Sequence, residues 1–222
     1  MVNYVRKKFN HLQKLRRYEG IYQSFRGHTM VPENWYITNL LLAEKVLDQE
    51  GAIVECGVWK GGMIGGIAKI LGPQRHYYLY DSFEGLPDAQ EIDGQRALDW
   101  QNNTESPTYY DNCKAAVEDA ERAMQIAGAR HFEISKGWFE NTLPQYSGGT
   151  VALLRLDGDW YDSTMTCLKE MYPRVKKGGI IIVDDYYFWD GCARAIHDYL
   201  SEHQATARIK TFNNQVCWLK KY

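Results

Sequence analysis

The sequence has few cysteines, and none stands in a pattern typical of a metal cluster or a disulfide framework. Its five cysteines are an odd number and include no Cys-x-x-Cys pair. This distribution argues against both kinds of covalent or metal-based staple. We therefore expect reduced thiols and a cytoplasmic protein.

Long apolar runs and an excess of charge of one sign are also missing. A membrane-spanning helix needs about 18 or more consecutive apolar residues, and the sequence has no such run. No apolar segment follows the first six residues, so we predict no signal peptide. The net charge is −2 over 222 residues, which gives no indication of a nucleic-acid partner.

The chain does contain a regular alternation of short apolar strands and helical segments. We predict strands at 52–56, 76–81, 130–135, 151–157, 179–184, 206–212 and 215–219. We predict helices at 34–47, 62–71, 110–127, 162–174 and 191–203. This order predicts an α/β, Rossmann-like fold with a seven-stranded, mostly parallel sheet and helices on both faces. Asn213-Asn214 predicts a closing hairpin that forms an antiparallel edge.

The N-terminal segment lies outside this alternation. Residues 1–18 carry six basic side chains, and Val5, Phe9, Leu12 and Leu15 recur at helical spacing, which predicts a basic amphipathic helix. We predict a loop over 20–32, and divide the chain into a helix-and-loop extension (1–32) and a main domain (33–222). The apolar stripe is expected to dock on the main domain or on a second subunit. We predict a homo-oligomer, most simply a dimer, and a membrane-surface or phosphate-binding role is the alternative.

A second segment without a clear period covers residues 82–107. It is rich in Gly, Pro, Asp, Gln and Asn and is predicted to be a long loop or lid. Structureless segments of this length inside a domain are often functional.

The ends of the first two strands indicate an adenosine ligand. The first strand leads into Glu55-Cys-Gly-Val-Trp-Lys-Gly-Gly62, and glycines allow a ligand to approach the backbone at the start of a helix. Trp59 interrupts the Gly-x-Gly-x-x-Gly pattern, and a Walker A loop is absent. Asp81 ends the second strand and can accept hydrogen bonds from both ribose hydroxyls. These residues leave NAD, S-adenosylmethionine and a tight turn without a ligand open.

The ends of the fourth and fifth strands are acidic. Asp157 and Asp159 follow one strand, and Asp184 and Asp185 follow the other. If the two strands are neighbours, four carboxylates share a small volume and repel one another unless a cation is present. A hard divalent ion such as Mg²⁺ binds oxygen ligands. The alternative is that these acids only cap helices.

Several stretches, taken together, resemble the macrocin-type O-methyltransferases, which methylate hydroxyls on antibiotic sugars and related natural products. They span roughly residues 29–200. The matching stretches are Thr29-Met30, Glu55 to Gly62, Asp81-Ser-Phe-Glu-Gly-Leu-Pro87, Gly137-Trp-Phe-Glu-Asn-Thr-Leu-Pro144, Asp157-Gly-Asp-Trp-Tyr-Asp-Ser-Thr164, Asp184-Asp-Tyr186 and Gly191 to Ala195.

The resemblance implies a class I methyltransferase fold, S-adenosylmethionine and Mg²⁺. It implies that Asp157, Asp184 and Asp185 bind the metal and that Asp159 is the general base. The residues that it implies for cofactor binding are Thr29, Met30, Glu55, Gly57, Gly61, Asp81, Ser82, Gly137, Trp138 and Asp157. His28 and His197 are alternative candidates for the base.

The expected reaction is metal-dependent transfer of a methyl group from S-adenosylmethionine to a hydroxyl of a small molecule. A sugar, a natural product or a catechol-like diol would serve, and we favour a vicinal diol because two oxygens can chelate one metal ion. Aromatic residues near the acidic strand ends are expected to line a pocket or to pack in the core: Trp160, Tyr161, Tyr186, Tyr187, Phe188 and Trp189. An NAD(P)-dependent oxidoreductase and a non-catalytic ligand-binding protein on the same fold remain alternatives.

Overall fold

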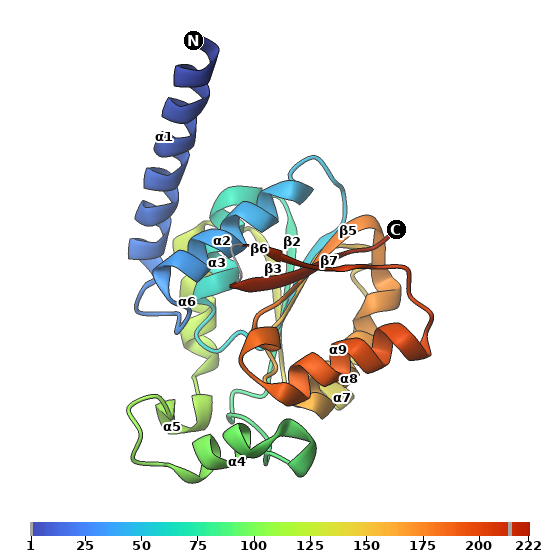
Figure 1. Cartoon of the computed structure of the whole chain (residues 1–222). Helices are drawn as coiled ribbons and strands as arrows, with labels where there is room; N and C mark the ends of the chain where they lie inside the picture. Colours follow the sequence, from blue (N-terminus) through green and yellow to red (C-terminus); the bar gives the residue numbers. More distant parts are fainter. Residues whose placement is uncertain (1, 213–214) are drawn as a thin grey trace.

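The computed structural model describes residues 2–212 and 215–222. Its centre is a seven-stranded sheet in the order β3-β2-β1-β4-β5-β7-β6 (Figure 1). The strands are β1 (Ala52–Cys56), β2 (His76–Asp81), β3 (His131–Lys136), β4 (Val151–Leu156), β5 (Val175–Val183), β6 (Ile209–Phe212) and β7 (Val216–Lys220). The predicted fold class is confirmed.

The first five strands of the chain run parallel, and β7 pairs antiparallel with both β5 and β6. The predicted hairpin edge is therefore present, although its expected turn, Asn213-Asn214, lies outside the described residues. Because β1, β2, β4 and β5 are parallel neighbours, their carboxyl ends meet at one edge of the sheet. This edge is where an open α/β sheet binds its ligands.

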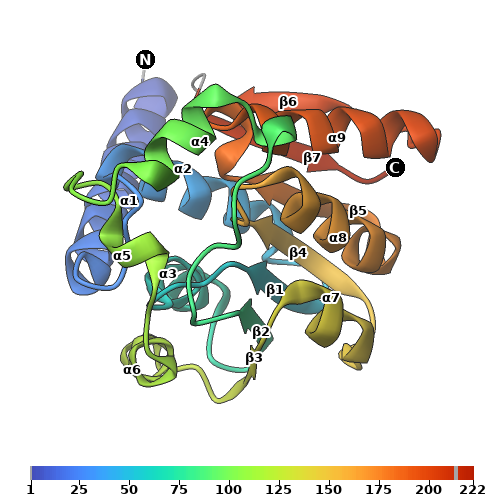
Figure 2. The ribbon, with the colours of Figure 1, turned by 90° about the horizontal axis from the view of Figure 1, so that it is seen from below.

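Helices cover both faces of the sheet (Figure 2). Alternate residues of β1 join two different apolar cores, since Ile53 belongs to one and Val54 to the other. The first core includes α1 (Val2–Phe25), α2 (Glu33–Ala43), α3 (Gly62–Leu71) and α6 (Val117–Ala127). The second face carries α7 (Phe139–Thr142), α8 (Tyr161–Met171) and α9 (Asp190–Glu202). Short 3₁₀ turns are η1 (Glu44–Val46), η3 (Leu143–Gln145), η4 (Tyr172–Arg174) and η5 (Asp185–Tyr187).

The loop predicted to begin at residue 20 begins later, because α1 continues to Phe25. Tyr18, Ile21 and Phe25 lie on one face of this helix at spacings of three and four residues, and all three are buried in the first core. Their burial stabilises the helix past Gly20. The proposed division of the chain at residue 32 stays a prediction.

The segment predicted as a structureless loop contains regular structure. It carries η2 (Glu91–Asp93) and α4 (Gln95–Asn102), and Ala97 of α4 is fully buried. Asp93 and Gln90 form a reciprocal capping box at the start of η2. We call residues 85–113 the lid.

The single helix predicted over 110–127 is also wrong. The helix α6 begins at Val117, and the short α5 (Tyr110–Cys113) consists of residues with positive φ. Asn112 explains the break, because its backbone oxygen accepts the N–H of Leu86 and its side chain donates to the carbonyl of Leu86. These contacts hold α5 against the start of the lid.

Within the described residues, no helix is both long and apolar enough to cross a lipid bilayer.

Candidate functional site

A cavity of about 970 Å³ opens at the carboxyl ends of β1, β2, β4 and β5. The lid and the segment before α2 complete its wall. Every predicted site residue lines it except Gly61: Thr29, Met30, Glu55, Gly57, Asp81, Ser82, Gly137, Trp138, Asp157, Asp159, Asp184 and Asp185. Residues predicted to bind cofactor and residues predicted to bind metal thus share one cavity.

The glycine turn after β1 needs glycine at position 57 for two reasons. Its φ of +87° is disfavoured for other residues, and a Cβ there would lie 1.7 Å from the carbonyl oxygen of Asp157. The turn therefore packs directly against the residue after β4. Gly61 has a different task, since it caps α3 with a φ of +75° and packs against Ala120 of α6.

Asp81, at the end of β2, holds this turn. Its Oδ2 accepts the backbone N–H groups of Val58 and Trp59, each at 2.8 Å, and its Oδ1 accepts that of Phe83 at 2.7 Å. Burial raises the pKa of Asp81, and these three N–H donors oppose the rise. The carboxylate thus has less free capacity for two ribose hydroxyls than the sequence suggested, because Oδ1 has one remaining lone pair.

An arginine that the sequence analysis overlooked forms the floor of the cavity. Arg155 of β4 is 1% exposed and makes ion pairs with three carboxylates: with Glu55 at 2.6 Å, Asp157 at 2.7 Å and Asp184 at 2.5 Å. The signal that was available is a lone charged residue within the otherwise apolar strand Val151–Leu156. Such a residue is almost never fully buried without partners.

Glu55 of β1 has an incompletely satisfied carboxylate. Its Oε1 accepts Arg155, but its Oε2 is buried and has no hydrogen-bond partner among the described residues. Burial, outweighing the attraction of Arg155, raises the pKa of Glu55 to about 7. An orphaned carboxylate oxygen beside the cavity is suited to accept hydrogen bonds from a cationic amino group.

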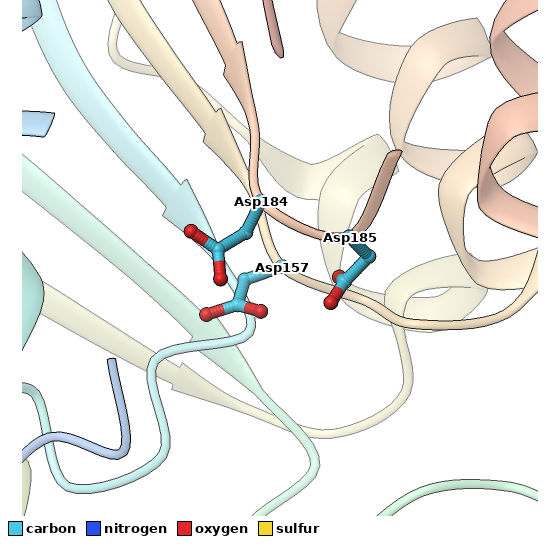
Figure 3. A group of neighbouring side chains, drawn as sticks. All are labelled: Asp157, Asp184 and Asp185. Carbon is cyan, nitrogen blue, oxygen red and sulfur yellow. The ribbon is translucent and has the colours of Figure 1, made fainter. Parts of the chain in front are cut away.

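Three carboxylates converge at the ends of β4 and β5. Asp157, Asp184 and Asp185 each offer an oxygen within 4.8 Å of the others, and Figure 3 shows Asp157 between the other two. Burial raises the pKa of Asp184 to about 6 and that of Asp185 well above its usual range, with the neighbouring carboxylates adding to both shifts. This excess of negative charge and the hard oxygen donors fit a divalent cation.

Asp159 lies beside these three residues in a constrained position. Its φ of +57° is left-handed, a conformation that costs a non-glycine residue about 1 kcal/mol or more. Its backbone N–H donates to Asp185 Oδ2 at 3.1 Å, and its Oδ1 accepts the indole N–H of Trp189 at 2.8 Å. Burial and the nearby Asp157 raise the pKa of Asp159 to about 8.

The other candidates from the sequence have different places. The described residues that line the cavity do not include His28 or His197. The Nε2 of His197 instead lies 3.0 Å from the hydroxyl oxygen of Tyr186. Of the six aromatic residues near the acidic strand ends, Phe188 and Trp189 line the cavity. The sequence analysis missed two lid residues of the same wall, Arg96 and Trp100, because it assigned the lid no structure.

One known protein family matches almost the whole chain. The family model described as macrocin O-methyltransferase (TylF) matches residues 2–221. The 8-demethyl-8-(2,3-dimethoxy-alpha-L-rhamnosyl)-tetracenomycin-C 4'-O-methyltransferase of Streptomyces olivaceus is 33% identical to this chain over 188 residues. The match covers 78% of this chain and 67% of the relative. The demethyldecarbamoylnovobiocin O-methyltransferase of Streptomyces niveus is 32% identical over 180 residues, 76% of this chain and 65% of the relative. The chain thus spans about two thirds of the length of these relatives.

The structural comparison agrees with the sequence comparison. The solved structure of the O-methyltransferase NovP has a TM-score of 0.74 with this chain at 28% identity, covering 87% of this chain and 82% of NovP.

Proposed function

Since the chain belongs to the macrocin O-methyltransferase family and is thus an S-adenosylmethionine-dependent O-methyltransferase, we propose that it methylates a sugar hydroxyl of a natural product with the help of a bound divalent cation. The observation that carries the proposal is the convergence of Asp157, Asp184 and Asp185 beside Asp159 in one cavity. The oxidoreductase and the non-catalytic alternatives are set aside on the family assignment.

The names of the relatives support a sugar acceptor. One of them acts on a rhamnosyl tetracenomycin, and another is a mycinamicin III 3''-O-methyltransferase. The cavity of about 970 Å³ is at the upper end of the range for small-molecule sites, which suits a donor and an acceptor together. Within this class we favour an acceptor with two adjacent hydroxyls.

For S-adenosylmethionine, the residues at the glycine turn form the proposed binding site. The molecule supplies an electrophilic methyl group on a sulfonium sulfur. The orphaned Glu55 Oε2 would accept the amino group of its methionine part, and Gly57 would let the chain of the ligand pass close to the backbone. Asp81 and Ser82 would contact the ribose, Gly137 and Trp138 the adenine, and Thr29 and Met30 the region of the methyl group.

For the cation, Asp157, Asp184 and Asp185 are the proposed ligands. A bound Mg²⁺ would orient a hydroxyl oxygen and lower its pKa. Arg155 holds one oxygen each of Asp157 and Asp184, so their carboxylates keep fixed orientations. Asp159 Oδ2 would take the proton of the acceptor hydroxyl, because Asp159 Oδ1 already accepts Trp189.

Metal dependence is tested by removing one proposed ligand at a time. We expect Asp157→Asn and Asp184→Asn to abolish saturable Mg²⁺ binding in calorimetric titration and to lower turnover as strongly as EDTA does, because an amide offers one neutral oxygen in place of a carboxylate. Asp99→Asn, an exposed acid of the lid, is the matched control and should retain both properties. Turnover that is unchanged by EDTA and by Asp184→Asn would contradict the metal proposal.

We also propose that a second copy of the chain covers α1. Figure 1 shows the N-terminal half of this helix projecting from the body, and Leu12 of its predicted apolar stripe is 50% exposed. Light scattering should give twice the monomer mass, and Leu12→Glu should shift it toward the monomer. Leu47→Glu, at another exposed leucine, is the control, and a monomeric wild type would refute the dimer. The cytoplasmic location stays a prediction.

A further inference from the structure

The lid forms hydrogen bonds with the segment that carries Asp159. We call residues 157–161, which run from the end of β4 to the first residue of α8, the base loop. The indole N–H of Trp160 donates to the carbonyl of Pro87 at 2.9 Å, and the backbone N–H of Tyr161 donates to Asp93 Oδ1 at 2.7 Å. Both lid contacts fall on the two residues that immediately follow Asp159.

Asp93 makes the second of these contacts from a buried position. Its side chain is 2% exposed, and its Oδ2 accepts the backbone N–H of Gln90 within the lid. The helix α8 has no side-chain cap of its own, so Asp93 serves one of its free N–H groups from outside the helix. A Cβ at Gly191 would lie 2.1 Å from Asp93 Oδ1, so the glycine there leaves room for this carboxylate.

Trp189 makes the contact with the carboxylate of Asp159 itself. Its indole N–H donates to Asp159 Oδ1 at 2.8 Å. The Trp189 ring packs edge-on against Trp160 of the base loop, with centroids 5.2 Å apart, and against Trp100 of the lid, at 6.0 Å. The ring is 8% exposed, so its donor is held in one direction.

We propose that Trp189 is a positioning residue for Asp159 and that Asp93 locks the lid onto this arrangement. An indole can only donate, so Trp189 occupies Asp159 Oδ1 and presents Oδ2 to the acceptor hydroxyl. Proton transfer requires the acceptor oxygen to be within hydrogen-bond reach of the proton, and orientation of reacting groups contributes strongly to rate. The inference rests on the proposed role of Asp159 as the base.

A double-mutant cycle tests the inference. We measure steady-state methyl transfer with labelled S-adenosylmethionine for the wild type, Trp189→Phe, Asp159→Asn and the double variant, all with Mg²⁺. Trp189→Phe should lower kcat by about 10- to 100-fold, the usual value of a hydrogen bond to a charged group, with KM for S-adenosylmethionine changed less than about twofold. In the Asp159→Asn background the same change should alter kcat by less than about twofold.

Two results would overturn the positioning role. One is a wild-type kcat in Trp189→Phe, and the other is an equal loss in both backgrounds, since Trp189 would then act without Asp159. Failure of the proposed role of Asp159 as the base gives a different result, because Asp159→Asn alone would then retain wild-type kcat. Trp218→Phe, at a half-buried tryptophan of β7, is the matched control, and equal melting temperatures establish that the variants fold.

The lock is tested by Asp93→Ala with Asp88→Ala, an exposed acid of the lid, as the control. Asp93→Ala should lower kcat in the wild-type background and have less than about a twofold effect in the Trp189→Phe background, because the lock acts on the Asp159 carboxylate only through the position of Trp189. Independent, multiplicative losses, or a wild-type kcat in Asp93→Ala, would overturn the lock.

Discussion

Asp159→Asn is expected to lower kcat by about 10²- to 10⁴-fold, the usual contribution of a general base. The substitution keeps the shape of the side chain, and its amide oxygen can still accept the indole N–H of Trp189. Oδ2 is replaced by an NH₂ group that cannot take a proton. Since Asp157, Asp184 and Asp185 are unchanged, the affinities for Mg²⁺ and S-adenosylmethionine should stay within about threefold of the wild type.

Steady-state kinetics measures the expected loss of kcat, and calorimetry on the same preparations measures the two affinities. Asp99→Asn serves again as the control for removing a carboxylate from the lid. A kcat close to that of the wild type would show that another group takes the proton. Loss of Mg²⁺ binding together with kcat would instead make Asp159 a metal ligand.

Arg155→Met is expected to lower the free energy of unfolding by about 3–5 kcal/mol at pH 8, the usual cost of breaking a buried ion pair by removing one partner. The change leaves Glu55, Asp157 and Asp184 without the cation that pairs with all three. Methionine fills much of the same volume, so lost packing contributes less than the uncompensated charge.

The loss should depend on pH. Burial raises the pKa of Glu55 to about 7 and of Asp184 to about 6 even with Arg155 present. Acids with raised pKa values bind more protons in the folded state, so the stability they confer is present below their unfolded pKa of about 4 and is lost as the pH rises through 6 to 7. Without Arg155 these pKa values rise further, so Arg155→Met should cost less at pH 5 than at pH 8.

Urea unfolding at pH 5 and pH 8, with EDTA present, checks the magnitude and the sign. Arg194→Met, at an exposed arginine of α9, removes the same charge from the surface and should change stability by less than about 0.5 kcal/mol. A cost of Arg155→Met that is equal at the two pH values would contradict the assignment of the loss to ionised carboxylates. The proposed Mg²⁺ site forms only in the folded state, so Mg²⁺ in place of EDTA should recover part of the stability at pH 8.

The strands and their acidic ends could be predicted from the sequence because local pattern determines them. The strand at 76–81 matches β2, and the strand at 52–56 matches β1. Once strand order is known, parallel neighbours must bring their carboxyl ends together, so Asp157, Asp184 and Asp185 meet as the spacing predicted. Boundaries were less certain, since β5 begins at Val175 rather than at residue 179.

Contacts between distant segments were decided only by the tertiary structure. Arg155 reads as a single charge in an apolar strand, and nothing local shows that Glu55 from β1 and Asp184 after β5 will pair with it. Asp93 likewise shows a local capping pattern, but its bond to Tyr161 crosses 68 residues of sequence.

The sequence by itself therefore determined the alternation of strands and helices, the glycine turn and the acidic strand ends, since these depend on residues a few positions apart. The tertiary structure decided how the carboxylates are held, since Arg155 pairs with Asp157 and Asp184 and Trp189 donates to Asp159. It also decided how the lid packs beside them. The physical reason for these contacts is burial, because a charged or polar group excluded from water must find its partner in whichever segment packs against it.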